Sequence, residues 1–273
     1  MALPRYASLE DRLWHYGARA FTALVLAYLV LPILIIVPIS FTSGNLLAFP
    51  IPGFSLRWYE SLVHGSAWFD AARNSLVVGL SSTALSLVLG TLAAVGLTRA
   101  RFRLKPLVLA VLISPMVIPI VIVAVAVYFL FVSIGLVGTY IGLILAHTAL
   151  ASPFVVITMM AALDGYDVNL NRAAASLGAR PLTVFRRVTL PMVFPGFASG
   201  ALFAFATSFD EIVVALFIAS PEQRTLPRQI FSGVREYVSP GIAAVATILV
   251  LLSASLLLLM ELLRRRSERL RRR

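Results

Sequence analysis

Residues 107–132 read LVLAVLISPMVIPIVIVAVAVYFLFV, a run without a single charged side chain. A helix of about 20 apolar residues crosses the hydrocarbon core of a bilayer, which is about 30 Å thick. The run lacks the alternation of polar and apolar residues that is typical of barrel strands, so we predict a transmembrane helix. Other stretches share this character, and the six predicted spans are 19–41, 75–97, 107–132, 139–162, 197–219 and 241–262.

The composition of the whole chain supports the same fold class. Of the 273 residues, 60% are hydrophobic and 13% are charged, and the mean hydropathy is +0.94. Soluble domains contain about 45–50% apolar and about 25% charged residues, so a soluble enzyme, a disordered chain and a fibrous repeat are excluded. We therefore predict an all-α polytopic membrane protein. The chain has no cysteine, which excludes a disulfide framework and a thiolate metal site.

The net charge is +11, and the positive charges lie in short segments between the spans. This placement predicts an orientation in the membrane and no nucleic-acid partner. Of the 23 Lys and Arg residues, 18 fall in the two terminal segments and in the segments that follow the second and fourth spans. The positive-inside rule then places both termini in the cytoplasm. We expect the N-terminal segment 1–18 to be cytoplasmic, the first span to be a retained anchor, and the basic tail 264–273 to contact membrane lipid or a partner.

Motifs of catalysis are missing from the sequence. The single lysine, Lys105, follows Leu104, so no phosphate-binding loop ending in Gly-Lys-Ser/Thr is present. The three histidines lie on different segments without the spacing of metal ligands, and we expect His147 to be a packed, hydrogen-bonded side chain. We predict no enzyme activity and no cofactor in this chain. Pro115, Pro119 and Pro153 fall inside predicted spans and are expected to kink them.

The segment 164–195 is too well patterned for a linker. Asp167 or Asn169 is placed to cap a helix over 170–177, and Gly178 is placed to end it. Pro181 suits the first turn of a second helix that is expected to end before Pro191. Two short helices with an alanine patch would form a compact cytoplasmic knob that another protein can approach closely. The alternative is a helical hairpin that rests on lipid headgroups.

Residues 172–191, RAAASLGARPLTVFRRVTLP, resemble the EAA loop of ABC importer permeases, which have a MetI-like core. The family pattern is matched in register by Ala173, Ala174, Gly178, Val188, Leu190 and Pro191. The family's glutamate is replaced by Arg172, so the role of this position is open. The resemblance implies that the loop couples the chain to a separate ATPase, and that residues 19–273 form one transmembrane permease domain.

Other segments point to a subtype of this family. FSLRWYESL at 54–62, the pair Asn74-Ser75 and LPRQIFSGVREYVSP at 226–240 are similar to the second permease of spermidine/putrescine-type (PotC-like) importers. The resemblance implies polyamine import across the bacterial cytoplasmic (inner) membrane. The implied partners are a second homologous permease, two ATP-binding cassette subunits that bind ATP and Mg, and an extracytoplasmic solute-binding protein. Related permeases import amino acids, aminophosphonates, opines or ferric ions. A secondary transporter is the other alternative, although no inverted repeat is evident.

Two adjacent acids fall well inside the predicted span 197–219. An intramembrane carboxylate costs roughly 2.5–3.5 kcal/mol and usually faces the bundle interior or a wet cavity. We expect Asp210 or Glu211, with the neighbouring Phe209, to line a path for a polycation through charge pairing and cation–π contact. The alternative is that one acid caps a broken helix or pairs with an outer-loop arginine. The segments 42–74 and 220–240 are expected to contact the solute-binding protein, with Arg224, Arg228 and Arg235 as charged contacts.

Overall fold

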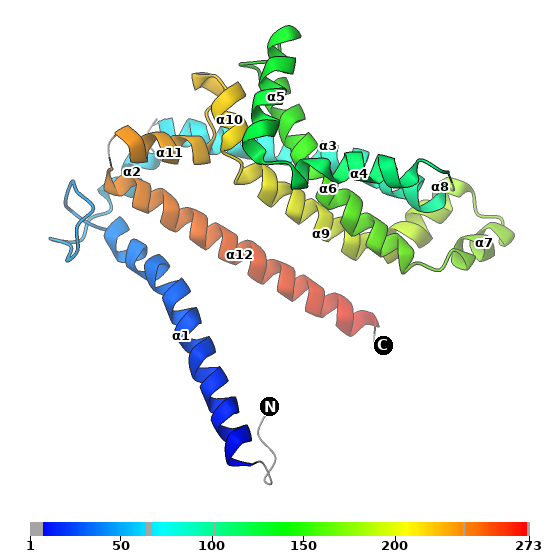
Figure 1. The fold of residues 1–273 in the computed structure, drawn as a ribbon, viewed down its shortest axis with the longest axis horizontal. Helices are drawn as coiled ribbons and strands as arrows, with labels where there is room; N and C mark the ends of the chain where they lie inside the picture. The colour runs from blue at the N-terminus through cyan, green and yellow to red at the C-terminus, as the bar shows by residue number, and fades with distance from the viewer. Residues whose placement is uncertain (1–7, 64–66, 101, 237, 272–273) are drawn as a thin grey trace. The chain divides into compact units, whose positions relative to one another are not determined.

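The computed structural model describes residues 8–63, 67–100, 102–236 and 238–271, and this part of the chain is almost entirely helical (Figure 1). Its one extended pairing is an isolated bridge between Thr42 and Phe54, so the predicted all-α class is confirmed. The helices are α1 (Leu9–Ser40), α2 (Arg57–Val63), α3 (Ala67–Arg99), α4 (Lys105–Val117), α5 (Ile120–Ser133), α6 (Tyr140–Asp164), α7 (Asn169–Ser176), α8 (Pro181–Val184), the π-helix η1 (Phe185–Thr189), α9 (Leu190–Phe209), α10 (Val213–Ile218), the 3₁₀-helix η2 (Pro221–Gln223), α11 (Leu226–Glu236) and α12 (Pro240–Arg271).

Four helical runs in the described residues are long and apolar enough to cross a membrane by themselves, and the bent pair of α4 and α5 raises the number to five. The four runs are Leu9–Ser40, Ala67–Arg99, Tyr140–Asp164 and Pro181–Phe209. The apolar part of α12, Pro240–Ser255, is shorter. Six spans with both termini in the cytoplasm therefore stay a prediction. The predicted segments 1–18 and 264–273 include residues 1–7 and 272–273, which lie outside the described residues.

The predicted span 107–132 is broken, and the expected kink at Pro119 was wrong. Helix α4 ends at Val117, Ile118 is extended with φ −72° and ψ 134°, and α5 starts at Ile120 at an angle of 107° to α4. The physical reason is that a residue before proline disfavours the helical conformation, while proline itself suits the start of the next helix. By contrast, Pro115 and Pro153 lie inside α4 and α6 and do not end them, and the kinks expected at these residues stay a prediction.

The contacts group the chain into two compact units, residues 1–65 with 233–273 and residues 66–232. In the first unit, α12 packs against α1 and α2. The loop between α1 and α2 folds back on itself, because Ser43 N–H donates to the carbonyl of Gly53 at 2.8 Å and Ser55 N–H to that of Phe41 at 2.7 Å. The prediction of a single permease domain over 19–273 stays a prediction.

The second unit is built on three long helices, α3, α6 and α9, which pack against one another (Figure 1). Two glycines let α9 approach α6 closely: a Cβ at Gly196 would overlap the Cβ of Ala162, and one at Gly200 would lie 2.7 Å from Oγ1 of Thr158. Side chains larger than hydrogen do not fit at these separations, so the glycines set the distance between two spans. The buried cluster at this end of the three helices comprises Ala94, Ala151, Val155, Met159, Leu163, Tyr166, Val193 and Ala204.

Candidate functional site

The first helix of the predicted knob, α7, carries Arg172, Ala173 and Ala174 and forms as its local sequence dictates. Asp167 Oδ1 accepts a hydrogen bond from the N–H of Asn169 at 2.9 Å, where the helix starts. At the other end Gly178 has φ +81°. Its N–H donates to the carbonyl of Ala175 at 2.9 Å, and the N–H of Ala179 donates to that of Ala174 at 3.1 Å. This pair of bonds is a Schellman motif, so the prediction that Gly178 ends the helix is confirmed.

The second helix of the knob starts at Pro181 as predicted, but the expectation that it ends before Pro191 was wrong. The chain remains helical through η1 into α9, which places Val188 in η1 and Leu190 and Pro191 in the first turn of α9. In η1 the N–H of Leu190 donates to the carbonyl of Phe185, five residues back. This wider turn accommodates a proline ring that would clash with the carbonyl four residues back in a regular helix. The knob is thus continuous with a span.

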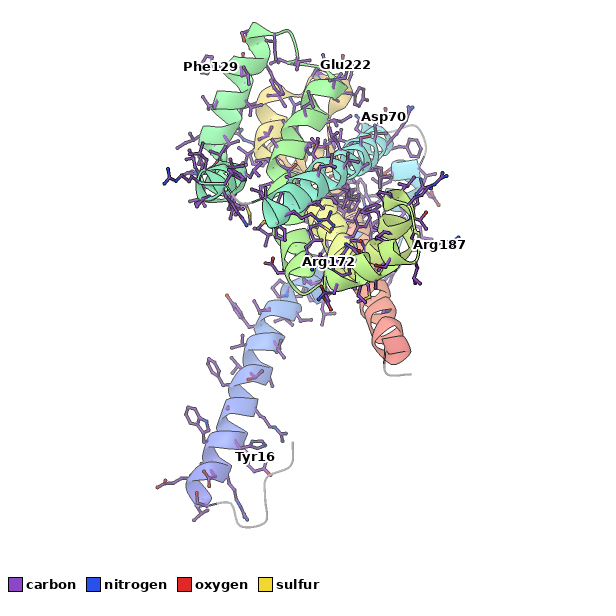
Figure 2. The ribbon with its side chains drawn as sticks, turned by 90° about the vertical axis from the view of Figure 1, so that its right-hand side faces the viewer. Tyr16, Asp70, Phe129, Arg172, Arg187 and Glu222 are labelled. Carbon is purple, nitrogen blue, oxygen red and sulfur yellow. The ribbon has the colours of Figure 1, made fainter. Side chains whose placement is uncertain are left out.

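The surface of the knob combines apolar and cationic side chains. Leu177, beside Gly178, is 89% exposed, and Leu182 is 59% exposed. The same segment carries four exposed arginines, which are Arg172, Arg180, Arg186 and Arg187. Residues 168–190 contain no acidic residue. Figure 2 shows Arg172 and Arg187 at the same end of the bundle. Exposed apolar side chains rimmed by charge are typical of a protein interaction site. Leu177 was not predicted as part of this surface, because its position before the glycine does not reveal its exposure.

The acid pair lies at a break in the predicted span 197–219, so the expectation of one unbroken helix was wrong. Helix α9 ends at Phe209, and α10 starts at Val213. Glu211 is 8% exposed, and its carboxylate accepts hydrogen bonds from the N–H groups of Val214 at 2.8 Å and Ala215 at 3.1 Å. Glu211 therefore caps α10, which is one of the alternatives that the sequence left open. Asp210 is exposed.

His147 of α6 lies beside the same break. It is fully buried, and its Nδ1 is 2.8 Å from Oγ of Ser208 on α9, so the prediction of a packed, hydrogen-bonded histidine is confirmed. Its Nε2 lies 3.6 Å from Oε2 of Glu211. The basic side chain beside Glu211 is therefore His147 of α6, whereas the sequence had suggested an outer-loop arginine as an alternative partner. Three residues from α6, α9 and the break form one polar cluster inside the bundle.

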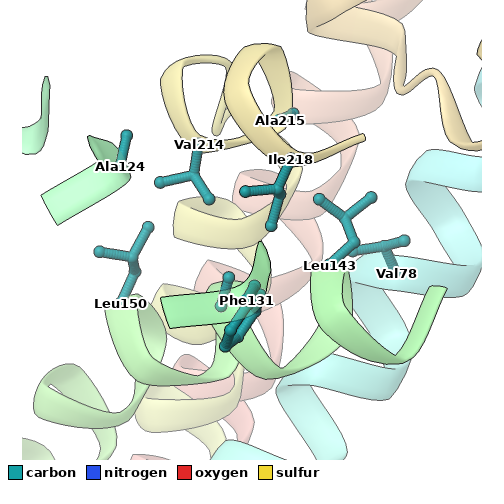
Figure 3. Close-up of a cluster of buried hydrophobic side chains, with 9 residues drawn as sticks. Val78, Ala124, Phe131, Leu143, Leu150, Val214, Ala215 and Ile218 are labelled. Atoms are coloured by element: carbon teal, nitrogen blue, oxygen red, sulfur yellow. The ribbon is translucent and has the colours of Figure 1, made fainter. Parts of the chain in front are cut away.

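Phe209 is half-buried, and its ring stacks on that of Phe205 with 5.2 Å between ring centroids. Both rings lie against Gly79 of α3, where a Cβ would be 3.1 Å from Phe205. Helix α10 is held by an apolar cluster: Figure 3 shows its residues Val214, Ala215 and Ile218 among Val78, Phe131, Leu143 and Leu150 of neighbouring helices. The break is therefore a packed feature of the fold that places Asp210 and Phe209 at a fixed position.

A second polar cluster joins the start of α3 to the segment after α10. The side-chain amide of Asn74 donates to the carbonyls of Glu222 at 2.8 Å and Arg224 at 3.0 Å, and its Oδ1 accepts from the hydroxyl of Tyr140 at 2.6 Å. Ser75 accepts from the N–H of Leu226 at 2.7 Å. In the sequence Asn74-Ser75 is recognisable only as part of a resemblance, because no local pattern reveals partners about 150 residues away.

Arg224 and Arg228, two of the three arginines expected to contact the solute-binding protein, form hydrogen bonds within this segment. Arg224 donates to Oε1 of Gln229 at 2.9 Å, and Arg228 donates to the carbonyl of Ala219 at 2.6 Å. Burial, together with the neighbouring charge of Arg224, lowers the pKa of Arg228 from its ordinary value. Arg235 is exposed on α11. Among the described residues there is no group of three or more His, Cys, Asp or Glu side chains that could hold a metal ion.

Comparisons with known proteins agree with this architecture. Residues 86–271 match the family described as "Binding-protein-dependent transport system inner membrane component". The spermidine/putrescine transport system permease protein PotC of Escherichia coli (strain K12) is 35% identical over 245 residues, which cover 90% of this chain and 92% of that protein. The putrescine transport system permease protein PotI of the same organism is 35% identical over 229 residues, which cover 81% of each chain.

The fold is also found in a solved structure of low sequence identity. A chain in the crystal structure of a bacterial ABC transporter involved in the import of the acidic polysaccharide alginate superposes with a TM-score of 0.74. It is 15% identical, and the match covers 96% of this chain and 99% of that chain. At this identity the likeness establishes the arrangement of the helices and leaves the transported solute open.

Proposed function

Because the chain belongs to the family of inner membrane components of binding-protein-dependent transport systems, we propose that it is the permease subunit of an ATP-driven polyamine importer. It is a multi-pass protein of the bacterial inner membrane, and its family consists of transport permeases and not of catalytic enzymes. The proposed substrate class rests on the 35% sequence identity to a spermidine/putrescine permease over 90% of the chain.

The break between α9 and α10 supports a path for a cation. The carboxylate of Glu211 is buried and accepts hydrogen bonds from two backbone N–H groups, whereas Asp210 is exposed. Phe205 and Phe209 lie next to it as a stacked pair. A carboxylate beside aromatic faces attracts an ammonium group by charge and by cation–π contact. Asp210 with Phe209 is therefore the proposed contact for the ammonium groups of a polyamine, and Glu211 holds the site in shape.

The partners follow from the family and from the surfaces of the chain. Dependence on a binding protein is part of the family's description, which supports docking of an extracytoplasmic solute-binding protein on the segments 42–74 and 220–240. The exposed apolar tip of the knob supports docking on one of two ATP-binding cassette subunits, which would bind ATP and Mg. A second homologous permease would complete the path. The arginines of the knob and the basic terminal segments support a cytoplasmic side for the knob and for both termini, and an even number of spans, which we propose to be six, fits this orientation.

Co-expression of the chain with the proposed second permease, ATP-binding cassette subunit and solute-binding protein tests this function. We expect an ATPase to co-purify with the chain, and cells with the complete system to accumulate radiolabelled spermidine or putrescine. Unlabelled polyamine should compete for uptake, whereas an amino acid or ferric ion should not. Purification without an ATPase would contradict the importer, and uptake of an amino acid, an aminophosphonate, an opine or ferric ion in place of polyamine would contradict the substrate.

A further inference from the structure

A single side-chain oxygen joins the knob to two spans. Oδ1 of Asn171, on α7, accepts hydrogen bonds from the hydroxyl of Tyr166 at 2.5 Å and from that of Thr189 at 3.0 Å. Tyr166 lies two residues after the last residue of α6, and Thr189 is the last residue of η1, which leads into α9. Through Asn171 the first helix of the knob is therefore tied to the end of one span and to the beginning of the next.

The two donors are anchored in the bundle. Tyr166 is 8% exposed, and its ring belongs to the buried cluster formed by α3, α6 and α9. Thr189 is 3% exposed. Hydrogen bonds between groups that are shielded from water are stronger than those on the surface, and buried polar groups need such partners. The acceptor thus connects α7 to the rigid part of the unit and not to another mobile side chain.

The rest of α7 offers little other attachment. Arg172, Ala173, Ala175 and Ser176 are exposed, while Asn171 is half-buried. Two glycines flank the segment that contains α7: Gly165 follows the last residue of α6, and Gly178 lies after α7. Short segments next to such positions commonly act as hinges. Apart from its contacts with α8 and η1, these two hydrogen bonds are the side-chain bonds that tie α7 to the ends of α6 and η1.

We propose that Asn171 is a positioning residue for coupling, which fixes α7 to α6 and α9 so that a movement imposed on the knob reaches both spans. The proposal rests on the proposed function, in which the knob docks on an ATPase. It assigns to Asn171 a role that is distinct from that of the docking surface, because its side chain points to Tyr166 and Thr189 and makes the knob stiff. Its neighbour on the same helix, Asn169, contacts Arg172 at 3.4 Å on the exposed side.

The test uses the complete complex in proteoliposomes and compares three variants. Asn171→Leu removes the acceptor at similar size, Asn171→Asp keeps an oxygen acceptor, and Asn169→Leu is the matched control on the same helix. The readouts are the amount of assembled complex and the ratio of polyamine transported to ATP hydrolysed. We expect Asn171→Leu to lower this ratio about fivefold or more, a usual size for coupling between distant sites. Asn171→Asp and Asn169→Leu should stay near the wild-type ratio.

Two milder variants address the donors separately. Tyr166→Phe and Thr189→Val each remove one hydroxyl and keep the shape, so each should lower the ratio in part and add nothing in combination with Asn171→Leu. They also keep the test decisive if Asn171→Leu does not assemble. An unchanged ratio in these variants, with or without a lower yield of complex, would overturn the positioning role. A wild-type complex that transports no polyamine or hydrolyses no ATP would refute the proposed function instead.

Discussion

Replacing Glu211 with alanine removes both oxygens that cap α10 and leaves two buried N–H groups, those of Val214 and Ala215, without partners. A buried donor without a partner costs about 1–3 kcal/mol, and the loss of a helix cap usually costs about 0.5–2 kcal/mol. Two such donors would cost about 2–6 kcal/mol, and because the cap value describes the same interaction as a whole, we expect the complex to lose about 2–4 kcal/mol of stability, at the lower end of that sum. For a chain of this size that corresponds to a fall in melting temperature of roughly 4–16 °C.

The neighbouring substitution Asp210→Asn is the matched comparison. Asp210 is exposed, and a substitution at such a position usually changes stability by less than about 0.5 kcal/mol. If it contacts the passing cation, Asp210→Asn should lower polyamine uptake at a normal yield of complex, because the amide keeps the shape and loses the charge. Glu211→Gln, which keeps one carbonyl oxygen, should fall between wild type and Glu211→Ala in stability.

The assay measures the yield of complex, its melting temperature and the uptake of radiolabelled spermidine for all three variants. A Glu211→Ala complex that melts with the wild type would refute the capping role. An Asp210→Asn complex with full uptake would refute the contact with the cation. The roles of the two acids are therefore distinguished by the quantity that changes: the melting temperature for Glu211 and the uptake of spermidine for Asp210.

Three further outcomes are expected. At Gly178, where φ is +81° and an added Cβ would have no atom within 4 Å, alanine and leucine should cost the same, about 1–2 kcal/mol of backbone strain, and asparagine less, measured by thermal melting of the complex. We also expect Gly178→Leu to uncouple ATP hydrolysis from transport, and a variant with normal transport and normal ATPase stimulation would contradict this. Asn74→Leu removes three hydrogen bonds and should destabilise the complex by about 1.5–4.5 kcal/mol, measured by thermal melting; a wild-type melting temperature would contradict it. A cysteine at the exposed Leu46 or Glu222 should cross-link to the solute-binding protein, and recovery of cytoplasmic partners alone would reverse the orientation.

Local chemistry explains what the sequence predicted well. The end of α7 at Gly178 depends on one residue that adopts positive φ without strain, and the start of α8 depends on the fixed φ of Pro181. The helical character of the apolar stretches follows from the need to satisfy backbone groups in lipid. His147 was expected to be packed and hydrogen-bonded because buried polar side chains usually have a hydrogen-bond partner, and its Nδ1 has one in Ser208.

The breaks in the predicted spans depend on partners that are distant in the chain. A helix end inside the bundle needs its N–H groups satisfied, and Glu211 does this only because α10 is packed on α3, α5 and α6. Hydropathy alone extends the span through both α9 and α10. Pro191 was expected to end a helix, and the π-turn before it, which removes the clash, has no signature in composition. Asn74 and Asn171 are ordinary polar residues in the sequence, and their bonds are visible only in the folded chain.

The most direct test of the central claim is ATP-dependent accumulation of radiolabelled spermidine in proteoliposomes that contain the purified complex and the solute-binding protein. We expect accumulation with ATP and Mg, and none when the nucleotide is replaced by a non-hydrolysable analogue. Spermidine uptake that is equal with and without ATP hydrolysis, or a complex that hydrolyses ATP and excludes spermidine, would contradict the assignment of this chain as the permease of a polyamine importer.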